Sequence, residues 1–196
     1  MNMNSHTIIL ASKSPRRKEL LEKAGYTVEI YLKEVEEDFP DDIKTDMVAE
    51  YLAIKKANEC AEAIKEDAIL LTADSVVILD DIIYGKPKDE AEAKDILRKL
   101  SGRTHKVITG VCLKSSNKTF SFSSTSLVTM DNLSEEEIQY YIENYRPYDK
   151  AGAYGIQEWI GLCKISKIEG SYANIMGLPI DMVYKNLERF WLNKYV

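Results

Sequence analysis

The chain contains 196 residues, of which 45% are hydrophobic and 30% charged, and its formal net charge is −6 at pH 7. Such a chain can bury a substantial core, either as one α/β domain or as two lobes sharing a cleft. The negative charge argues against broad nucleic-acid binding, which needs a basic face, and no apolar run approaches the ~20 residues of a membrane span. We therefore expect neither a nucleic acid polymer nor a membrane as a partner.

The first predicted elements are a buried strand beginning at Ile8, a polar turn and a helix. Ser14 suits the N-cap of that helix and Pro15 its first position. A helix N-terminus offers unpaired N–H donors and a partial positive charge, which favour phosphate. Arg16 and Arg17 lie in this first turn, where acidic residues are usual, so the turn is interpreted as an anion site. The alternative is a capped surface helix with two solvated arginines.

Strands and helices alternate along the rest of the chain, which favours an α/β fold with some antiparallel pairing in the second half. Thr45 is the expected cap of the second helix, and Asp80 and Asp81 are expected to form a turn. The predicted strands are 27–32, 68–72, 75–79, 82–84, 104–114, 119–130 and one near 161–165. The predicted later helices are about 46–65, one opening at Asp89, one from Ser134 to about Tyr145, and one from about Pro179.

Acidic residues in two places could act together. Asp74 lies between two predicted strands, and the carboxyl end of a buried strand is where open α/β sheets bind ligands. A turn aspartate is the equally plausible alternative. Glu34, Glu36, Glu37 and Asp38 are expected to form a largely solvated loop. One of them beside Asp74 would make a carboxylate pair able to hold Mg²⁺ or Mn²⁺.

Two lysines are candidates for binding phosphate. Lys56 shares an otherwise apolar face of the second predicted helix, and Lys86 lies between Gly85 and Pro87 at a rigid bend. A snorkelling lysine and an ordinary turn lysine are the alternatives. Together with the arginines of the first helix, the two lysines indicate a phosphate clamp.

The glycine-rich stretch 148–157 ends in Gln157. Small residues allow backbone to approach a ligand closely, and a glutamine amide both donates and accepts hydrogen bonds. This pairing suits the edge of a nucleobase, although composition alone favours a plain glycine-rich connection.

The cysteines and histidines do not form a metal-ligand pattern. Cys60, Cys112 and Cys163 are far apart and odd in number, and the chain has two histidines. This usage fits a reducing cytosol, with the cysteines expected as buried small hydrophobes.

Several short motifs follow one another along nearly the whole chain. They are 12–17 (Ser-Lys-Ser-Pro-Arg-Arg), 73–75 (Ala-Asp-Ser), 85–87 (Gly-Lys-Pro), 100–105, 149–157, 170–172 and 176–179. In their order and spacing these motifs resemble those of the Maf family. The longest motif is similar to that of the subgroup that hydrolyses dTTP and UTP.

The resemblance implies a Maf/ITPase-like α/β fold, with a mixed twisted sheet flanked by helices, two lobes around a deep cleft, and a single domain over 1–196. It implies a nucleoside triphosphate pyrophosphatase that cuts dTTP and UTP between the α and β phosphates. It also implies a divalent cation (Mg²⁺, Mn²⁺ or Co²⁺), a cytoplasmic location and a homodimer. Modified or non-standard nucleotides, and a non-catalytic nucleotide-binding regulator of cell division, remain as alternatives.

The resemblance also implies roles for individual residues. Asp74 would be the catalytic proton acceptor and would hold the metal together with Glu37. The resemblance places Lys56 and Lys86 at the phosphates, and the anion site predicted at the first helix adds Ser12, Ser14 and Arg17 to the phosphate-binding residues. Those implied in substrate specificity are Arg16, Ser75 and Gln157.

The chain departs from the family pattern in three places. Ser75 replaces the usual threonine, Thr72 replaces a common glycine, and Glu158 and Trp159 follow Gln157 where a glycine is usual. These departures leave the implied reaction class intact and leave the exact substrate list open.

Overall fold

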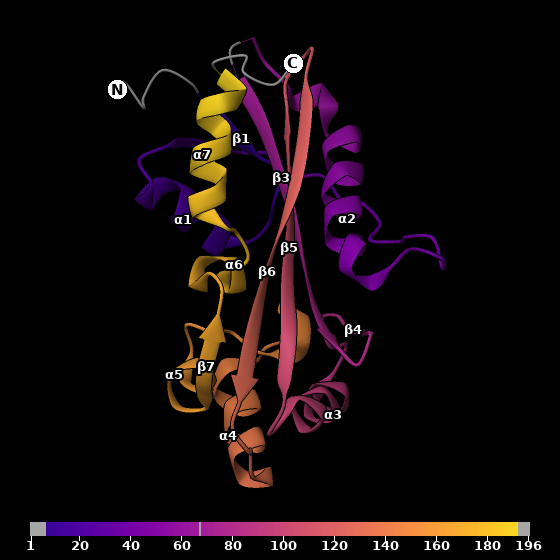
Figure 1. Cartoon of the computed structure of the whole chain (residues 1–196), viewed down its shortest axis with the longest axis vertical. Coiled ribbons are helices and arrows are strands. Elements are labelled where there is room, and N and C mark those ends of the chain that lie inside the picture. Colours follow the sequence, from indigo (N-terminus) through magenta and orange to yellow (C-terminus); the bar gives the residue numbers. More distant parts are fainter. Residues whose placement is uncertain (1–6, 67, 192–196) are drawn as a thin grey trace. The chain divides into compact units, whose positions relative to one another are not determined.

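The computed structural model describes residues 7–66 and 68–191, in which the strands form one mixed sheet flanked by helices (Figure 1). The sheet order is β2 (Thr27–Ile30), β1 (Thr7–Leu10), β3 (Ala68–Leu79), β5 (Thr104–Lys114), β6 (Thr119–Met130) and β7 (Ile165–Glu169), and the short strand β4 (Ile82–Tyr84) also pairs with β3. β1 is parallel to both β2 and β3, whereas β4 is antiparallel to β3 and β7 to β6. The α/β prediction with antiparallel pairing in the second half is confirmed.

Helices of different length connect these strands. None of those in the described part of the chain is long and apolar enough to cross a bilayer. The helices are α1 (Pro15–Lys23), α2 (Thr45–Glu59), α3 (Glu90–Leu100), α4 (Glu135–Tyr145), α5 (Trp159–Cys163), α6 (Tyr172–Met176) and α7 (Ile180–Trp191), with 3₁₀ turns η2 (Ala61–Ala63) and η3 (Ala151–Ala153).

The described residues divide into two compact units. The first unit contains 7–66, 68–74, 109–124 and 177–191, and the second contains 75–108 and 125–176. The expectation of a single domain over 1–196 stays a prediction.

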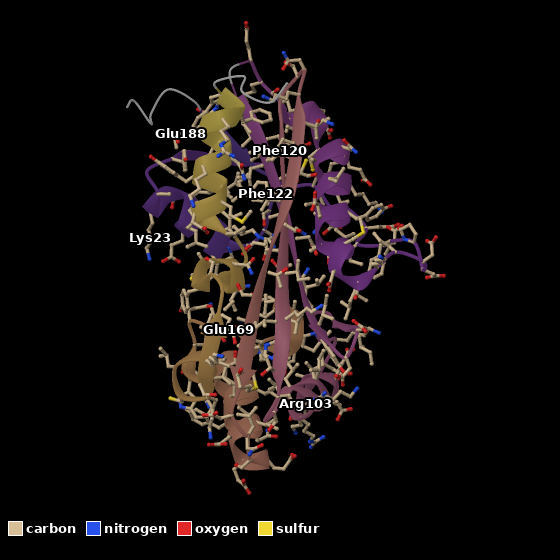
Figure 2. The ribbon with its side chains drawn as sticks, in the orientation of Figure 1. Lys23, Arg103, Phe120, Phe122, Glu169 and Glu188 are labelled. Carbon is tan, nitrogen blue, oxygen red and sulfur yellow. The ribbon has the colours of Figure 1, made fainter. Side chains whose placement is uncertain are left out.

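The first unit packs helices on both faces of its strands. Because successive strand residues point to opposite faces, Ile8 and Leu10 join a cluster with α1 and α7, whereas Ile9 joins a different one (Figure 1). Phe122 is buried in the cluster of Ile8 and Leu10, and Phe120 packs against it (Figure 2). α2 covers the other face of the strands, where it contributes apolar residues beside the buried Cys112.

Gly110 allows α2 to lie directly on β5. A Cβ added at Gly110 would lie 2.3 Å from the backbone carbon of Ala49, well inside van der Waals contact. The absence of a side chain at this position therefore sets how closely α2 approaches the sheet.

The second unit has its own apolar core, formed between α3, α4 and the strands. Within it His105 is 1% exposed, and its Nε2 lies 2.7 Å from the Tyr154 hydroxyl. Burial lowers the pKa of His105 to about 4 from the usual 6.5.

This buried histidine predicts a loss of stability in acid. Between pH 6.5 and 4 the unfolded chain binds a proton at His105 that the folded chain does not, so the free energy of unfolding should fall with pH by about 3 kcal/mol. Urea unfolding at pH 4 to 7 would measure this loss. A His105→Gln variant should lose less over the same range, since glutamine does not titrate. Parallel curves for the two proteins would contradict the prediction.

Several predicted boundaries are confirmed. β5 and β6 have the predicted bounds, and Asp80 and Asp81 form the turn between β3 and β4, both with positive φ. Ser134 forms a full capping box at α4, and the Asp89 side chain accepts a hydrogen bond from the Glu92 N–H at α3. These boundaries could be predicted because capping and turn residues next to each element mark them.

Three boundaries differ from the prediction. The stretches 68–72 and 75–79 form a single strand, β3, because the intervening Asp74 is buried and paired rather than turned to solvent. The expected strand near 161–165 is the helix α5 followed by β7, since a short apolar run has no decisive period. β2 ends at Ile30, two residues earlier than expected.

Both ends of α2 differ from the prediction, whereas the predicted start of α1 is confirmed. Lys44, not Thr45, is the N-cap of α2, and α2 ends at Glu59 instead of near residue 65. The Lys33 ammonium donates to the carbonyl of Glu59 and so caps this helix end. Ser14 is the N-cap of α1 with Pro15 in the first turn, but the Ser14 side chain makes no capping hydrogen bond. Cys163 is exposed, so the expectation of burial was wrong for it and holds for the other two cysteines.

Candidate functional site

The side chain of Lys56 in α2 contacts two carboxylates within the first unit. Its Nζ donates to Asp74 Oδ1 at 2.6 Å and to Glu37 Oε1 at 2.8 Å. The Lys56 and Asp74 side chains are 14% and 9% exposed, and that of Glu37 is 44% exposed. One largely buried ammonium therefore holds together two acids that are far apart in the sequence.

The docking of α2 on β3 explains why Lys56 meets Asp74. The Thr72 hydroxyl, two residues before Asp74, donates to the Ala53 carbonyl at 2.6 Å. Ala53 precedes Lys56 by about one helical turn and is fully buried against the sheet. This hydrogen bond sets the position of α2 along the direction of β3. In the sequence, Thr72 stood out only because it departs from the family pattern.

The acidic stretch that contains Glu37 is held by lysines on several elements. Lys13 Nζ contacts Glu34 Oε1 at 2.8 Å, and Lys55 pairs with Asp38. Hydrogen bonds from these lysines lower the pKa of both Glu34 and Asp38. The stretch is solvated as predicted, but the sequence did not predict that Lys13 and Lys55 pair with it. The only sequence feature that pointed to these pairs is the opposite charge of the lysines and the acidic residues.

Arg17 connects the turn before α1 to the strand that carries Asp74. Its Nη1 donates to the Ala73 carbonyl at 2.8 Å and to Ser12 Oγ at 3.2 Å. Its Nε donates to the Gly177 carbonyl at 2.8 Å. Burial lowers the pKa of Arg17, while the nearby charge of Asp74 acts in the opposite direction. Arg17 thus braces the backbone next to Asp74, and its contact with phosphate stays a prediction.

The turn between β1 and α1 contributes further polar groups to the first unit. The Ser14 backbone N–H donates to Ser12 Oγ at 3.2 Å, so the turn closes on the Ser12 hydroxyl. Arg16 is half-buried and close enough to Arg17 to disfavour the charge of that guanidinium. Two cationic side chains therefore lie together at the start of α1, as the sequence predicted.

The second unit contains the remaining candidate residues, Ser75, Lys86 and Gln157. Lys86 is exposed at the end of β4, and the carbonyl of the preceding Gly85 accepts a hydrogen bond from the Gly152 N–H at 3.1 Å. The bend with Lys86 is thereby joined to the glycine-rich segment that carries Gln157. Ser75 is partly buried in β3, directly after Asp74.

The side chain of Gln157 contains a buried polar atom. Its Oε1 is buried and has no hydrogen-bond partner among the described residues. A buried acceptor of this kind costs free energy unless a donor reaches it.

The described residues contain no group of three or more histidine, cysteine, aspartate or glutamate side chains that could hold a metal ion. Glu37 and Asp74 nevertheless bring two carboxylates together at Lys56, and the charge of Arg17 also acts on both. Mg²⁺ is commonly held by one or two carboxylates together with substrate phosphates and water. The pair therefore fits a cation shared with a polyphosphate better than a cation held by protein alone.

Comparisons with known proteins agree with the motifs seen in the sequence. A family model described as Maf-like protein matches residues 7–190. A relative from Porphyromonas gingivalis named dTTP/UTP pyrophosphatase is 48% identical over 194 residues, covering 96% of each chain. Relatives with the same name from Phocaeicola vulgatus and Bacteroides thetaiotaomicron are 48% and 46% identical, each covering 96% of this chain and 98% of the relative.

Proposed function

This chain belongs to the Maf family, and from that premise we propose that it is an enzyme that hydrolyses dTTP and UTP to the nucleoside monophosphate and pyrophosphate. The observation that carries the proposal is the contact of the Lys56 ammonium with both Glu37 and Asp74. The names of relatives at 46% to 48% identity over nearly the full length support the choice of substrate.

The proposed reaction is the attack of water on the α-phosphorus. The water oxygen bonds to phosphorus, the bond from phosphorus to the bridging oxygen of the β-phosphate breaks, and pyrophosphate leaves with that electron pair. Asp74 accepts a proton from the water in this scheme. The Asp74 carboxylate would be held in place by Lys56, which donates to its Oδ1, and by the preceding backbone, whose Ala73 carbonyl is bound by Arg17.

Positive charge has to offset the charge of the triphosphate before an anionic centre can be attacked. Lys56, Lys86 and Arg16 are proposed to supply it, while Ser12, Ser14 and Arg17 would contribute hydroxyl, backbone and guanidinium donors. A divalent cation (Mg²⁺, Mn²⁺ or Co²⁺), held by Glu37 and Asp74, would add charge neutralisation at the phosphates. Whether Asp74 acts as base or as metal ligand, its carboxylate is required.

Membership of the family also leads us to propose a location, an oligomeric state and a limit on the substrate class. We propose that the protein works in the cytoplasm, as a homodimer, and without a nucleic acid polymer as substrate. The free cysteines and the net charge of −6 support the first and last of these. Light scattering after size-exclusion chromatography would measure the mass of the particle.

The experiment that tests the function is a screen of standard and modified nucleoside triphosphates with Mg²⁺, Mn²⁺ and Co²⁺. We expect dTTP and UTP to be the preferred substrates, with monophosphate and pyrophosphate released in equal amounts. Nucleoside diphosphate and inorganic phosphate as products would contradict the proposed bond cleavage. Saturable binding without any release would favour the regulator instead.

A Gln157→Ala variant should lose preference among bases more than it loses phosphate binding. We expect kcat/KM for dTTP and UTP to fall about tenfold, because a hydrogen bond to the base would be lost, while purine triphosphates change little. Gln139→Ala is the matched control, since the Gln139 amide donates to Glu90 and Glu143 on the helix surface. Equal losses for every nucleotide would indicate that Gln157 supports the fold instead.

A further inference from the structure

Gln157 lies in a tight turn of the second unit. The Glu158 N–H donates to the Gly155 carbonyl at 3.1 Å, which closes the four residues 155–158. Gln157 is the third residue of this turn, and Ile156 beside it is buried. The orientation of the Gln157 amide therefore depends on how firmly the two ends of the turn are held.

Both ends of the turn are bound to the same phenol oxygen, that of Tyr141 in α4. The Gly155 N–H donates to the Tyr141 hydroxyl at 2.9 Å, and this hydroxyl donates to Oε2 of Glu158. Tyr141 is fully buried, and burial together with the hydrogen bond to Glu158 raises its pKa, so the hydroxyl keeps its proton at neutral pH. One protonated oxygen thus fixes the residues on either side of Gln157.

Lys150 holds the second oxygen of the Glu158 carboxylate. Its Nζ lies 3.1 Å from Glu158 Oε1 and 2.7 Å from Asp149 Oδ1, and its side chain is only 8% exposed. Burying an ion pair is costly, and such pairs contribute more to a defined geometry than to net stability in the best-attested cases. Each oxygen of Glu158 therefore has a separate partner, which leaves the carboxylate one orientation.

Gly155 completes this arrangement by leaving room for the carboxylate. A Cβ added at Gly155 would lie 2.8 Å from the carboxyl carbon of Glu158. The carboxylate consequently packs directly over the backbone at the start of the turn, where any larger residue would displace it.

We propose that Tyr141 and Glu158 are positioning residues for base recognition, which hold the turn 155–158 so that the Gln157 amide is presented in one direction. This inference rests on the proposed function, in which Gln157 contacts the nucleobase. Neither residue touches the reacting phosphates in this scheme. Loosening the turn should therefore raise KM for pyrimidine nucleotides, since binding would then have to order it, and should change kcat little.

The test uses two substitutions with small changes of shape. Tyr141→Phe keeps the buried ring and removes the oxygen that joins both ends of the turn, whereas Glu158→Gln keeps the side-chain length and removes the charge facing Lys150. For each we expect kcat/KM with dTTP and UTP to fall about tenfold through KM, and with ATP and GTP by less than about threefold. Tyr145→Phe is the control, because the Tyr145 ring stacks on that of Tyr141 at 5.1 Å and its substitution should leave base preference unchanged.

The outcomes separate this inference from the proposed function. If the unaltered protein releases no pyrophosphate from any triphosphate, the proposed function fails. If it prefers pyrimidine nucleotides and both folded variants keep that preference and KM, only the positioning role fails. Equal losses for all nucleotides, or loss of cooperative thermal unfolding in both variants, would also overturn that role, because the pair would then maintain the fold instead of the turn.

Discussion

An Asp74→Asn variant should fold like the unaltered protein and release pyrophosphate about a thousandfold more slowly. Asparagine has the shape of aspartate and can still accept the hydrogen bond from Lys56, and Lys56 keeps its contact with Glu37. The amide cannot take a proton from water and carries no charge for a cation. Continuous measurement of pyrophosphate release from dTTP, with thermal unfolding of the same sample, would check both parts of this expectation.

The control for this change is Asp80→Asn. Asp80 accepts two hydrogen bonds from Arg103 at the exposed turn after β3, so its substitution should leave turnover unchanged. Turnover of the Asp74→Asn protein near that of the control would remove Asp74 from the chemistry.

The second large effect is expected from Lys56→Gln. This change leaves Glu37 and Asp74 close together without the ammonium between them, and it removes one of the cationic groups proposed for the phosphates. We expect kcat/KM to fall about a hundredfold, with a lower midpoint of thermal unfolding, because an interaction that offsets two partly buried charges is lost. Steady-state kinetics with dTTP would measure the first effect and calorimetry the second.

The neighbouring Lys55 offers a matched control on the same helix. Lys55 pairs with Asp38, whose side chain is 71% exposed, and an exposed pair of this kind contributes little. Lys55→Gln should therefore keep kcat/KM within about twofold of the unaltered value. Similar losses in the two variants would mean that the charge of α2 as a whole matters, and not the contact of Lys56 with its two carboxylates.

The sequence predicted best those elements whose signals are local. β5 and β6 are long runs bounded by turn residues, and Ser134 and Asp89 cap their helices through side chains only three residues from their partners. Such features depend on neighbouring residues alone, so no knowledge of the fold is needed to identify them.

Features that depend on distant residues could be predicted only in part. Asp74 has the sequence neighbourhood of a turn, but it lies inside a continuous strand because Lys56 of another element neutralises it. The acidic residues themselves indicated only that one of the four in 34–38 could lie beside Asp74, and the family resemblance was needed to select Glu37. That choice depends on the docking of α2 on β3, which includes the bond from Thr72 to Ala53.

The support of the Gln157 turn was not predicted at all. Tyr141 has the spacing of a core residue on α4, and nothing local indicates that its hydroxyl meets both Gly155 and Glu158. In the sequence, Glu158 stands out only as a departure from the family pattern, which does not indicate its hydrogen-bond partners. A buried hydrogen-bond network of this kind becomes visible only when the elements are packed.

The close approach at Gly110 has a consequence for heritable variation in this protein. Any replacement with a side chain must push away the α2 backbone at Ala49, and Lys56 follows on the same rigid helix. Alleles that inactivate the protein should therefore arise at a codon whose residue contacts neither the carboxylates nor a nucleotide. Among variants that inactivate the protein, substitutions of Gly110 should therefore be as frequent as substitutions of Glu37 or Asp74.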